Sequence, residues 1–210
     1  MWKVTFLPKP IFILLLTASV VLFSCKKHYY NETRKIQTGS PIAGEWDFNS
    51  MNAQTQSSEE YTLGSFEHKS ETVLNYTTEN NSGKLVINDS VITAIELTYT
   101  ISSHIKTYNY TNGLLKDSTE TPYKISFYEP MLSCNYKMIG DDSVSFPKGG
   151  FSNMAASTFR TDPLPAQIIF NGDTLMFKEH IYKDTSTVKF GTVYRTIQTG
   201  TTMMTLVKHK

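Results

Sequence analysis

Residues 91–110 read VITAIELTYTISSHIKTYNY, and their alternation of apolar and polar side chains is the strongest indication of the fold. The odd-numbered positions from Val91 to Ile105 are mainly apolar, and the even-numbered positions from Ile92 to Lys106 are mainly polar. Because successive side chains of a β-strand point to opposite faces, this pattern predicts a strand with one face on a core and the other in water. No stretch of ten or more residues of the domain keeps a helical period, so we expect an all-β protein.

The length of this segment indicates a curved sheet. Twenty residues at about 3.3 Å each extend over about 66 Å, too far for one flat strand, so the strand must coil or contain a β-bulge, as strands of small barrels do. We therefore expect residues 41–210 to form one domain, an antiparallel up-and-down β-barrel of about 8–10 strands. An open β-sandwich is the alternative, because alternation with a period of two is common to both.

An Asn-Gly pair at residues 112–113 predicts a β-hairpin. A three-residue loop over 111–113 sets Ile101 opposite Tyr123, whereas a two-residue loop puts Tyr123 on the polar face. We expect the three-residue loop, or a bulge near Pro122 that restores the same faces. The same register pairs Tyr99 with Ile125 and Leu97 with Phe127.

A second Asn-Gly pair, at residues 171–172, predicts a two-residue loop that pairs Ile168 with Leu175 and Ala166 with Phe177. The segment 149–165, rich in Gly and Pro, does not fit a strand, and we expect a loop or a short helix there. Other strand candidates are residues 44–51, 71–78, 84–88, 133–139, 143–146, 189–198 and 203–208.

The first 24 residues have the features of a removable signal peptide. Lys3 and Lys9 precede an apolar run over residues 11–23, and this run is too short to cross about 30 Å of hydrocarbon as a helix. The run ends in LFSC at 22–25, which resembles the lipobox of bacterial lipoproteins. The resemblance implies cleavage between Ser24 and Cys25 and a diacylglycerol on the Cys25 thiol. The alternatives are an ordinary signal peptide or an uncleaved anchor that ends near a cysteine.

The residues after Cys25 predict where the domain is held. Residues 25–40 are polar and without a period, so we expect a flexible tether. In lipoproteins of Bacteroidota, acidic residues just after the cysteine are linked to surface export, and here Lys26 and Lys27 occupy these positions. We therefore expect a lipid-anchored protein of the cell envelope, at the outer membrane and on its periplasmic face rather than at the surface.

The composition excludes several classes of protein. Without Lys3 and Lys9 the chain has 18 basic against 19 acidic residues, so it lacks the basic surplus of a nucleic-acid-binding protein. Aromatic residues make up 12%, which is too many for a disordered chain. If Cys25 is acylated, Cys134 has no cysteine to pair with, and we expect it to be buried in a strand.

Motifs for catalysis, metal or cofactor binding are not evident. The histidines have no ligand spacing, and there is no Gly-x-Ser-x-Gly motif or phosphate-binding glycine loop. The acidic pairs Asp141-Asp142 and Glu59-Glu60 are typical of solvated turns, because a calcium site needs more oxygen ligands at regular spacing. We therefore expect neither an enzyme nor a protein with a metal or cofactor. The histidines are His28, His68, His104, His180 and His209.

The start of the domain carries Gly44-Glu45-Trp46. A Gly-x-Trp motif in the first strand is similar to the opening motif of lipocalins, and together with the leader it resembles the lipocalin-like lipoproteins of Bacteroidota. The resemblance implies that Trp46 closes one end of the barrel. It also implies that an arginine near the last strand, here Arg195, packs across the indole.

Two functions fit this reading. A barrel of this size can enclose one small apolar ligand. The alternative is a structural or interaction lipoprotein with a solid barrel that holds a partner protein at the membrane through its loops. The candidate ligand-facing residues are Phe48, Leu97, Tyr99, Ile101, Tyr123, Ile125 and Phe127.

Overall fold

The computed structural model describes residues 39–147 and 164–210. The expected signal peptide, Cys25, the tether up to residue 38 and the segment from 149 to 163 lie outside the described residues. Within the described ranges, no helix is long and apolar enough to cross a membrane. The chain forms nine β-strands there: β1 (Gly44–Leu63), β2 (Phe66–Ile87), β3 (Val91–Thr111), β4 (Leu114–Asn135), β5 (Lys137–Ile139), β6 (Ser143–Phe146), β7 (Leu164–Asn171), β8 (Thr174–Lys189) and β9 (Thr192–Lys208).

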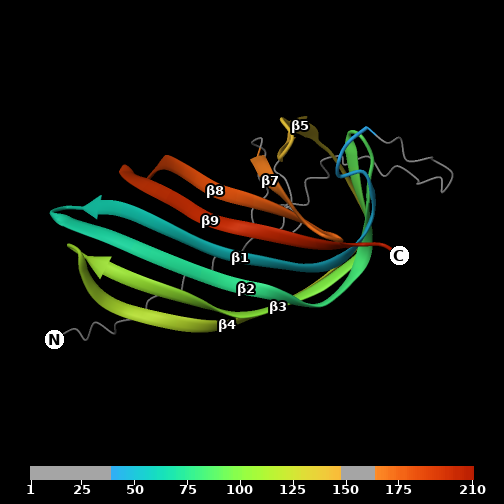
Figure 1. Ribbon diagram of the computed structural model, residues 1–210. Coiled ribbons are helices and arrows are strands. Elements are labelled where there is room, and N and C mark those ends of the chain that lie inside the picture. The colour runs from blue at the N-terminus through green and yellow to red at the C-terminus, as the bar shows by residue number, and fades with distance from the viewer. Residues whose placement is uncertain (1–38, 148–163) are drawn as a thin grey trace, which may run out of the picture.

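The strands form one antiparallel sheet in the order β4-β3-β2-β1-β9-β8-β7-β6-β5 (Figure 1). The prediction of an all-β, antiparallel protein is therefore confirmed. Most strands lie beside their neighbours in sequence, and the first strand also pairs with the last. Several strands are longer than the alternation predicted; β2, for example, joins the two candidates at 71–78 and 84–88.

The sheet is not closed into a barrel, which corrects the barrel prediction. Its edges are β4, with 22 residues, and β5, with three, and no pairing between them occurs among the described residues. Tyr136 alone separates these two strands in the sequence. Its backbone N–H donates to the Ser90 carbonyl at 2.8 Å, and its hydroxyl donates to Ser40 Oγ at 3.0 Å. The edges therefore approach each other at one end only, because β5 is too short to follow β4.

Backbone irregularities cross three neighbouring strands and bend the sheet. The register shifts beside Ser50 in β1. Positive φ angles occur at Asn80 (52°) and Gly83 (110°) in β2 and at Glu96 (52°) in β3. Such bulges turn the following side chains to the other face and increase local bending. The bend expected in the long strand is confirmed.

The bend changes which residues of β3 face the core. Ile92 and Ala94 are buried before Glu96, whereas Leu97, Tyr99 and Ile101 are buried after it. The prediction that odd-numbered residues keep one face is therefore wrong for residues 91–95.

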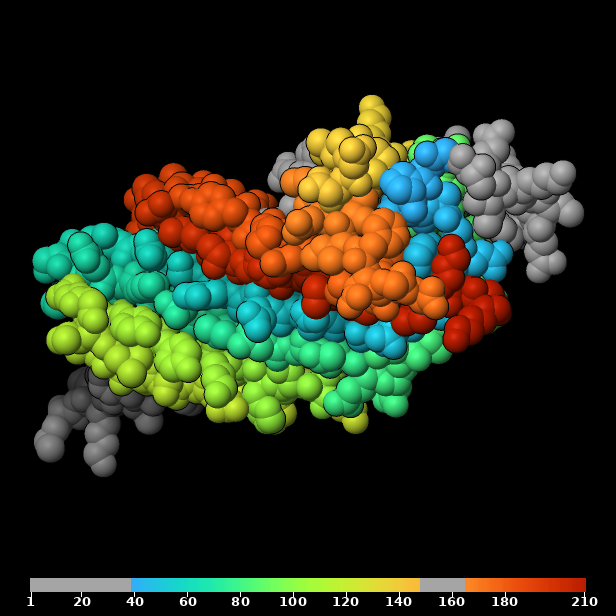
Figure 2. Space-filling view, in the orientation of Figure 1, coloured from blue at the N-terminus to red at the C-terminus, as the bar shows by residue number. Residues whose placement is uncertain are grey.

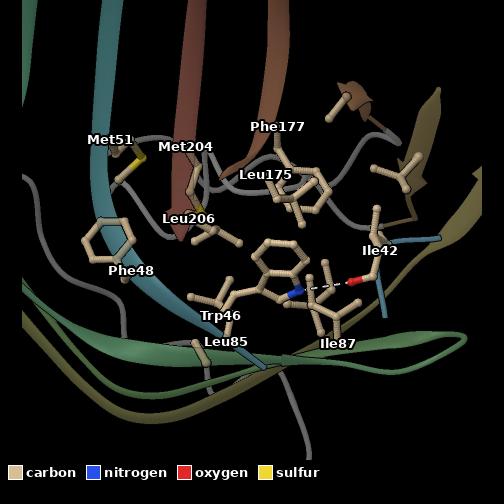
Figure 3. Close-up of a cluster of buried hydrophobic side chains, with 14 of the residues drawn as sticks. Ile42, Trp46, Phe48, Met51, Leu85, Ile87, Leu175, Phe177, Met204 and Leu206 are labelled. Atoms are coloured by element: carbon tan, nitrogen blue, oxygen red, sulfur yellow. Dashed lines mark hydrogen bonds between the residues drawn. The ribbon is translucent and has the colours of Figure 1, made fainter. Parts of the chain in front are cut away.

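The core lies at the end of the sheet where the edges approach (Figure 3). There the bent strands β1, β2 and β3 wrap around side chains from β6, β7, β8 and β9, so that one sheet provides both walls of the core. Apolar burial of this kind is the main stabilising contribution in a β-domain. Its largest fully buried side chains are Tyr99, Tyr136, Phe146, Phe177, Ile42, Met51, Leu85, Ile87, Ile92, Leu97 and Ile101.

The β3–β4 hairpin keeps the predicted faces with a different register. Asn112 (φ 50°) and Gly113 (φ 73°) form a two-residue turn rather than a three-residue loop. A register shift follows between Asn109 and Tyr110, so Ile101 pairs with Ile125, and Tyr99 pairs with Phe127. The pairs are therefore two residues away from those predicted, and the compensating irregularity lies beside the turn rather than near Pro122.

The β7–β8 hairpin has its turn one residue later than predicted. Asn171 pairs with Thr174, so the turn residues are Gly172 and Asp173, and Gly172 has φ 60°. Ile168 consequently pairs with Phe177 rather than with Leu175. Moving the turn by one residue changes each cross-strand partner by two residues, so the side chains keep their predicted faces.

Beyond the core, six strands continue as a single layer that we call the arm. It consists of residues 54–75, 103–124 and 181–200, in the strands β4, β3, β2, β1, β9 and β8. Most of its side chains are polar, and apart from the buried Ser58 they are exposed or half-buried on both faces. On the face seen in Figure 2, no second layer of described residues covers the arm. The protein therefore has a core end and an extended, solvent-exposed end.

Candidate functional site

Five aromatic side chains form a row across four neighbouring strands. Phe48 comes from β1, Tyr76 from β2, Tyr99 from β3, and Tyr123 and Phe127 from β4. The Phe48 and Tyr99 ring centroids are 5.8 Å apart, and those of Tyr99 and Phe127 are 4.9 Å apart. Separations in this range are favourable for aromatic pairs. The row lies where the core gives way to the arm.

The structure brings the seven predicted ligand-facing residues together, but it places them differently from an open cavity. Phe48, Leu97, Tyr99 and Ile101 are at most 4% exposed and belong to the core. Tyr123, Ile125 and Phe127 are half-buried and pack against it. Sequence reasoning missed Tyr76, because its segment shows no clear alternation that assigns it to this face.

Burial makes the tyrosine hydroxyl groups of the row weaker acids than the hydroxyl of an exposed tyrosine. It raises the pKa of Tyr76 to about 12, and nearby Tyr123 contributes to the rise. Burial also raises the pKa of Tyr99, with smaller contributions from Tyr76 and Tyr123, and burial alone raises the pKa of Tyr123. All three side chains therefore stay neutral at physiological pH, so the row carries no charge.

We expect Tyr76 to make the protein less stable in alkali. In the unfolded chain a tyrosine ionises near pH 10, whereas folded Tyr76 resists ionisation up to about pH 12. Its contribution is therefore fully present below pH 10 and is lost as the pH rises from 10 through 12. A two-unit shift corresponds to about 2 to 3 kcal/mol. Urea unfolding at several pH values would show a shallower loss for Tyr76→Phe than for the unchanged protein, and parallel curves would contradict the assignment.

Trp46 is buried in the core, and the cation that lies near its indole is Lys208 rather than the expected Arg195. The Trp46 Nε1–H donates to the Ile42 carbonyl at 3.0 Å, shown dashed in Figure 3. Lys208 Nζ lies 4.9 Å from the indole centroid. Gly44 has φ 148°, and a Cβ there would lie 3.4 Å from Lys208 Nζ and 3.5 Å from Trp46 Nε1. These are ordinary contact distances, so the backbone angle, rather than a lack of space, favours glycine at this position.

Arg195 lies in the arm, far from Trp46. It faces Glu60 across the β1–β9 ladder, while Trp46 faces Lys208 at the other end. The Arg195 guanidinium donates to both oxygens of Asp184, with Nη2 2.6 Å from Oδ2. This pairing lowers the pKa of Asp184. The prediction for Arg195 is corrected: β9 is 17 residues long, so the residue that reaches Trp46 is 13 positions further along the chain.

One carboxyl group is buried near the boundary between core and arm. Glu179 in β8 is 1% exposed, and Thr202 Oγ1 donates to its Oε2 at 3.1 Å. In residues 39–147 and 164–210, no three His, Cys, Asp or Glu side chains are grouped so as to hold a metal ion.

The far end of the arm has exposed apolar side chains that the sequence analysis did not single out. Three hairpins end there, at residues 63–66, 111–115 and 188–193, and we call them the hairpin tips. Each apolar side chain in these tips exposes more than half of its surface. The sequence signal is an apolar residue directly beside a turn glycine at 64, 113 and 191. The residues are Leu63, Phe66, Leu114, Leu115, Val188, Phe190 and Val193.

No protein-family model, no curated protein and no solved structure matches this chain.

Proposed function

We propose that the protein is a bacterial lipoprotein, anchored through Cys25, whose arm makes contact with a partner away from the anchoring membrane. The leader, the LFSC sequence at 22–25 and the polar residues that follow support the anchor. We place the protein in the cell envelope, at the outer membrane and on its periplasmic face. The Gly44 and Trp46 arrangement supports a distant, lipocalin-like relationship.

The observation that carries the contact function is the exposure of the arm. A single-layer sheet gains less from burial than a two-layer domain, because both of its faces stay in water. The arm nevertheless continues for about half the length of β1, and its exposed aliphatic and phenylalanine side chains gather at the end most distant from the core. Exposed apolar groups gathered in one place are typical of interaction sites.

Binding of a small apolar ligand, the other function that the sequence suggested, has less support. Four of its seven expected contact residues are packed in the core, so such a ligand would have to displace them or rest on the half-buried Tyr123, Ile125 and Phe127.

We expect Cys25→Ser to abolish lipidation, since the serine hydroxyl does not replace the thiol that receives the diacylglycerol. Labelled fatty acid would then be absent from the protein, and the protein would leave the membrane fraction after cell disruption. Ser24→Ala is the matched control, because it keeps a small residue before the cleavage site and should retain both label and membrane association. Labelling of the Cys25→Ser chain would refute the anchor.

A further inference from the structure

The three hairpin tips are held together as one row. Asn112 N–H donates to the Glu67 carbonyl at 2.8 Å, and Glu67 N–H donates to Asn112 Oδ1 at 2.9 Å, which joins the β3–β4 tip to the β1–β2 tip. On the other side, the Tyr61 and Tyr194 rings are 4.8 Å apart, which joins the β1–β2 tip to β9. Six strands spaced by about 4.8 Å make this row about 24 Å wide.

The apolar side chains of the row surround the sheet edge instead of lying on one face. Leu63 and Phe66 are a cross-strand pair on the face that continues from the core. Val188 and Val193 are a cross-strand pair on the opposite face, since their neighbours Thr187 and Tyr194 share the face of Tyr61. A protein partner packed on the sheet would select one face. Apolar groups on both faces suit a medium that surrounds the edge, such as lipid.

Phe190 is the most exposed of these apolar side chains and occupies a strained turn position. It has φ 53° and is followed by Gly191 with φ 79°, a combination that favours Asn-Gly. A bulky residue with positive φ is uncommon. Its ring is fully exposed, so intramolecular packing does not explain an aromatic residue at this turn.

Behind the apolar edge lies a belt of tyrosines and paired charges. Tyr61 stacks on His68 with centroids 4.9 Å apart, and Lys189 Nζ lies 5.0 Å from the Tyr194 centroid. Lys189 also lies 3.7 Å from Glu59, as an ion pair. Tyrosines and lysines are typical of the level of lipid headgroups. Tyr61 precedes Leu63 by two residues, about 7 Å along a strand, which matches the depth of interfacial insertion.

The tips face away from the point where the tether enters the domain. Gly39 lies at the core end, where its backbone N–H bonds to Asp89, and β1 runs 20 residues from there to the tips, on the order of 60 Å. The stretch of chain from 25 to 38 can span at most about 50 Å, even if it were fully extended. A domain that stands with its core end on the anchoring bilayer therefore holds its tips well away from that bilayer.

We propose that the hairpin tips insert into the headgroup region of a second lipid bilayer, one that faces the anchoring bilayer. This inference rests on the lipid anchor proposed above. The insertion is shallow, so the backbone groups of the three turns remain within reach of interfacial water. Lys69 and Lys189 near the tips are paired with Glu71 and Glu59, so we expect a mainly apolar attraction that does not require anionic lipid.

The experiment uses the mature lipidated protein with Phe190→Trp, reconstituted into phosphatidylcholine vesicles and isolated by flotation. Acceptor vesicles of the same lipid are then added. We expect a blue shift of the emission from the introduced indole and quenching by brominated lipid in the acceptor vesicles only; buried Trp46 provides a constant background. Quenching only by brominated lipid in the anchoring vesicles, or no shift at all, would overturn the proposal. Failure of the protein to float with the first vesicles would instead count against the anchor.

Matched variants distinguish the tips from other exposed apolar groups. The double change Leu114→Ser and Phe190→Ser should weaken acceptor-vesicle binding by about tenfold or more, while leaving the unfolding midpoint unchanged, because both side chains are exposed. Ile139→Ser, which changes another exposed aliphatic residue, in β5 at the core end, should not affect binding. Equal losses for both variants, or binding that needs anionic lipid and disappears in high salt, would contradict apolar insertion by the tips.

Discussion

Replacing Gly83 by alanine should destabilise the protein by more than about 3 kcal/mol, because two costs add at this position. Its φ of 110° is one that residues with a Cβ rarely adopt. A Cβ there would also lie 2.7 Å from both the Glu96 carbonyl oxygen and Leu97 Cα. These are backbone atoms at the bend of β3, so the strand itself would have to move. Urea unfolding monitored by Trp46 fluorescence measures the loss.

Gly64→Ala is the matched control for this prediction. Gly64 has φ 63° in the β1–β2 turn, and a Cβ there would meet nothing within 4 Å. Only the conformational cost remains, about 1 to 2 kcal/mol. If the two variants were equally destabilised, the close approach of β2 to β3 would not contribute, and the bend at Glu96 would not depend on a glycine opposite it.

Trp46→Ala should cost about 3 to 5 kcal/mol, the range for removing a large aromatic side chain from a core. The indole is 4% exposed, and its N–H bonds the Ile42 carbonyl, so the change leaves a cavity and an unpaired carbonyl. Trp46→Phe should lose less, because it keeps most of the apolar volume and gives up mainly the hydrogen bond. Chemical unfolding of both variants, followed by circular dichroism, gives the two values.

Alanine variants of Lys208 and Arg195 test which of the two cations interacts with Trp46. Lys208→Ala should cost about 0.5 to 1 kcal/mol, as expected for an exposed lysine whose ammonium group lies near an indole ring. Arg195→Ala should leave the free energy of unfolding unchanged within error, since its ion pair with Asp184 is exposed. A larger loss for Arg195→Ala than for Lys208→Ala would contradict the assignment of Lys208 as the cation that stabilises Trp46.

The alternation of side chains was enough to predict the strands, but not how they bend. The period of two in residues 91–110 predicted β3 almost residue for residue. The reversal of its faces at Glu96 depends on a positive φ at a residue that has no intrinsic preference for it. Gly83 of β2 approaches the backbone of Glu96 closely at this point, a contact that only the folded chain brings about.

Hairpin faces were predictable for a related reason. The apolar pattern fixes which side chains share a face, so an error of two residues leaves the faces unchanged, whereas an error of one residue would reverse them. This is why Tyr99 and Ile101 were placed on the correct face with the wrong partners. Barrel closure, in contrast, depends on the lengths of the edge strands β4 and β5, and the sequence pattern around Tyr136 does not reveal that β5 ends after three residues.

The candidate sites were also predictable from the sequence only in part. The core aromatics were recognisable as inward-facing, but not whether the space between them would be filled. Arg195 was chosen by its nearness to the last strand, and a strand of 17 residues separates its two ends widely. The hairpin tips needed the sheet order, since three turns at residues 64, 113 and 191 become neighbours only when β1 lies between β2 and β9.

The pairing of β1 with β9 also determines when the protein can fold. Trp46 faces Lys208 across this ladder, and the neighbouring Asp47 and His209 are 162 residues apart in the sequence. Contacts of such long range slow folding, because a large loop must close before they form. β1 can pair with β2 as soon as both strands have been made, but its other neighbour, β9, follows only after all the other strands. The described sheet is therefore complete only after β9 has been made, so we expect the β1–β9 ladder to form late in folding.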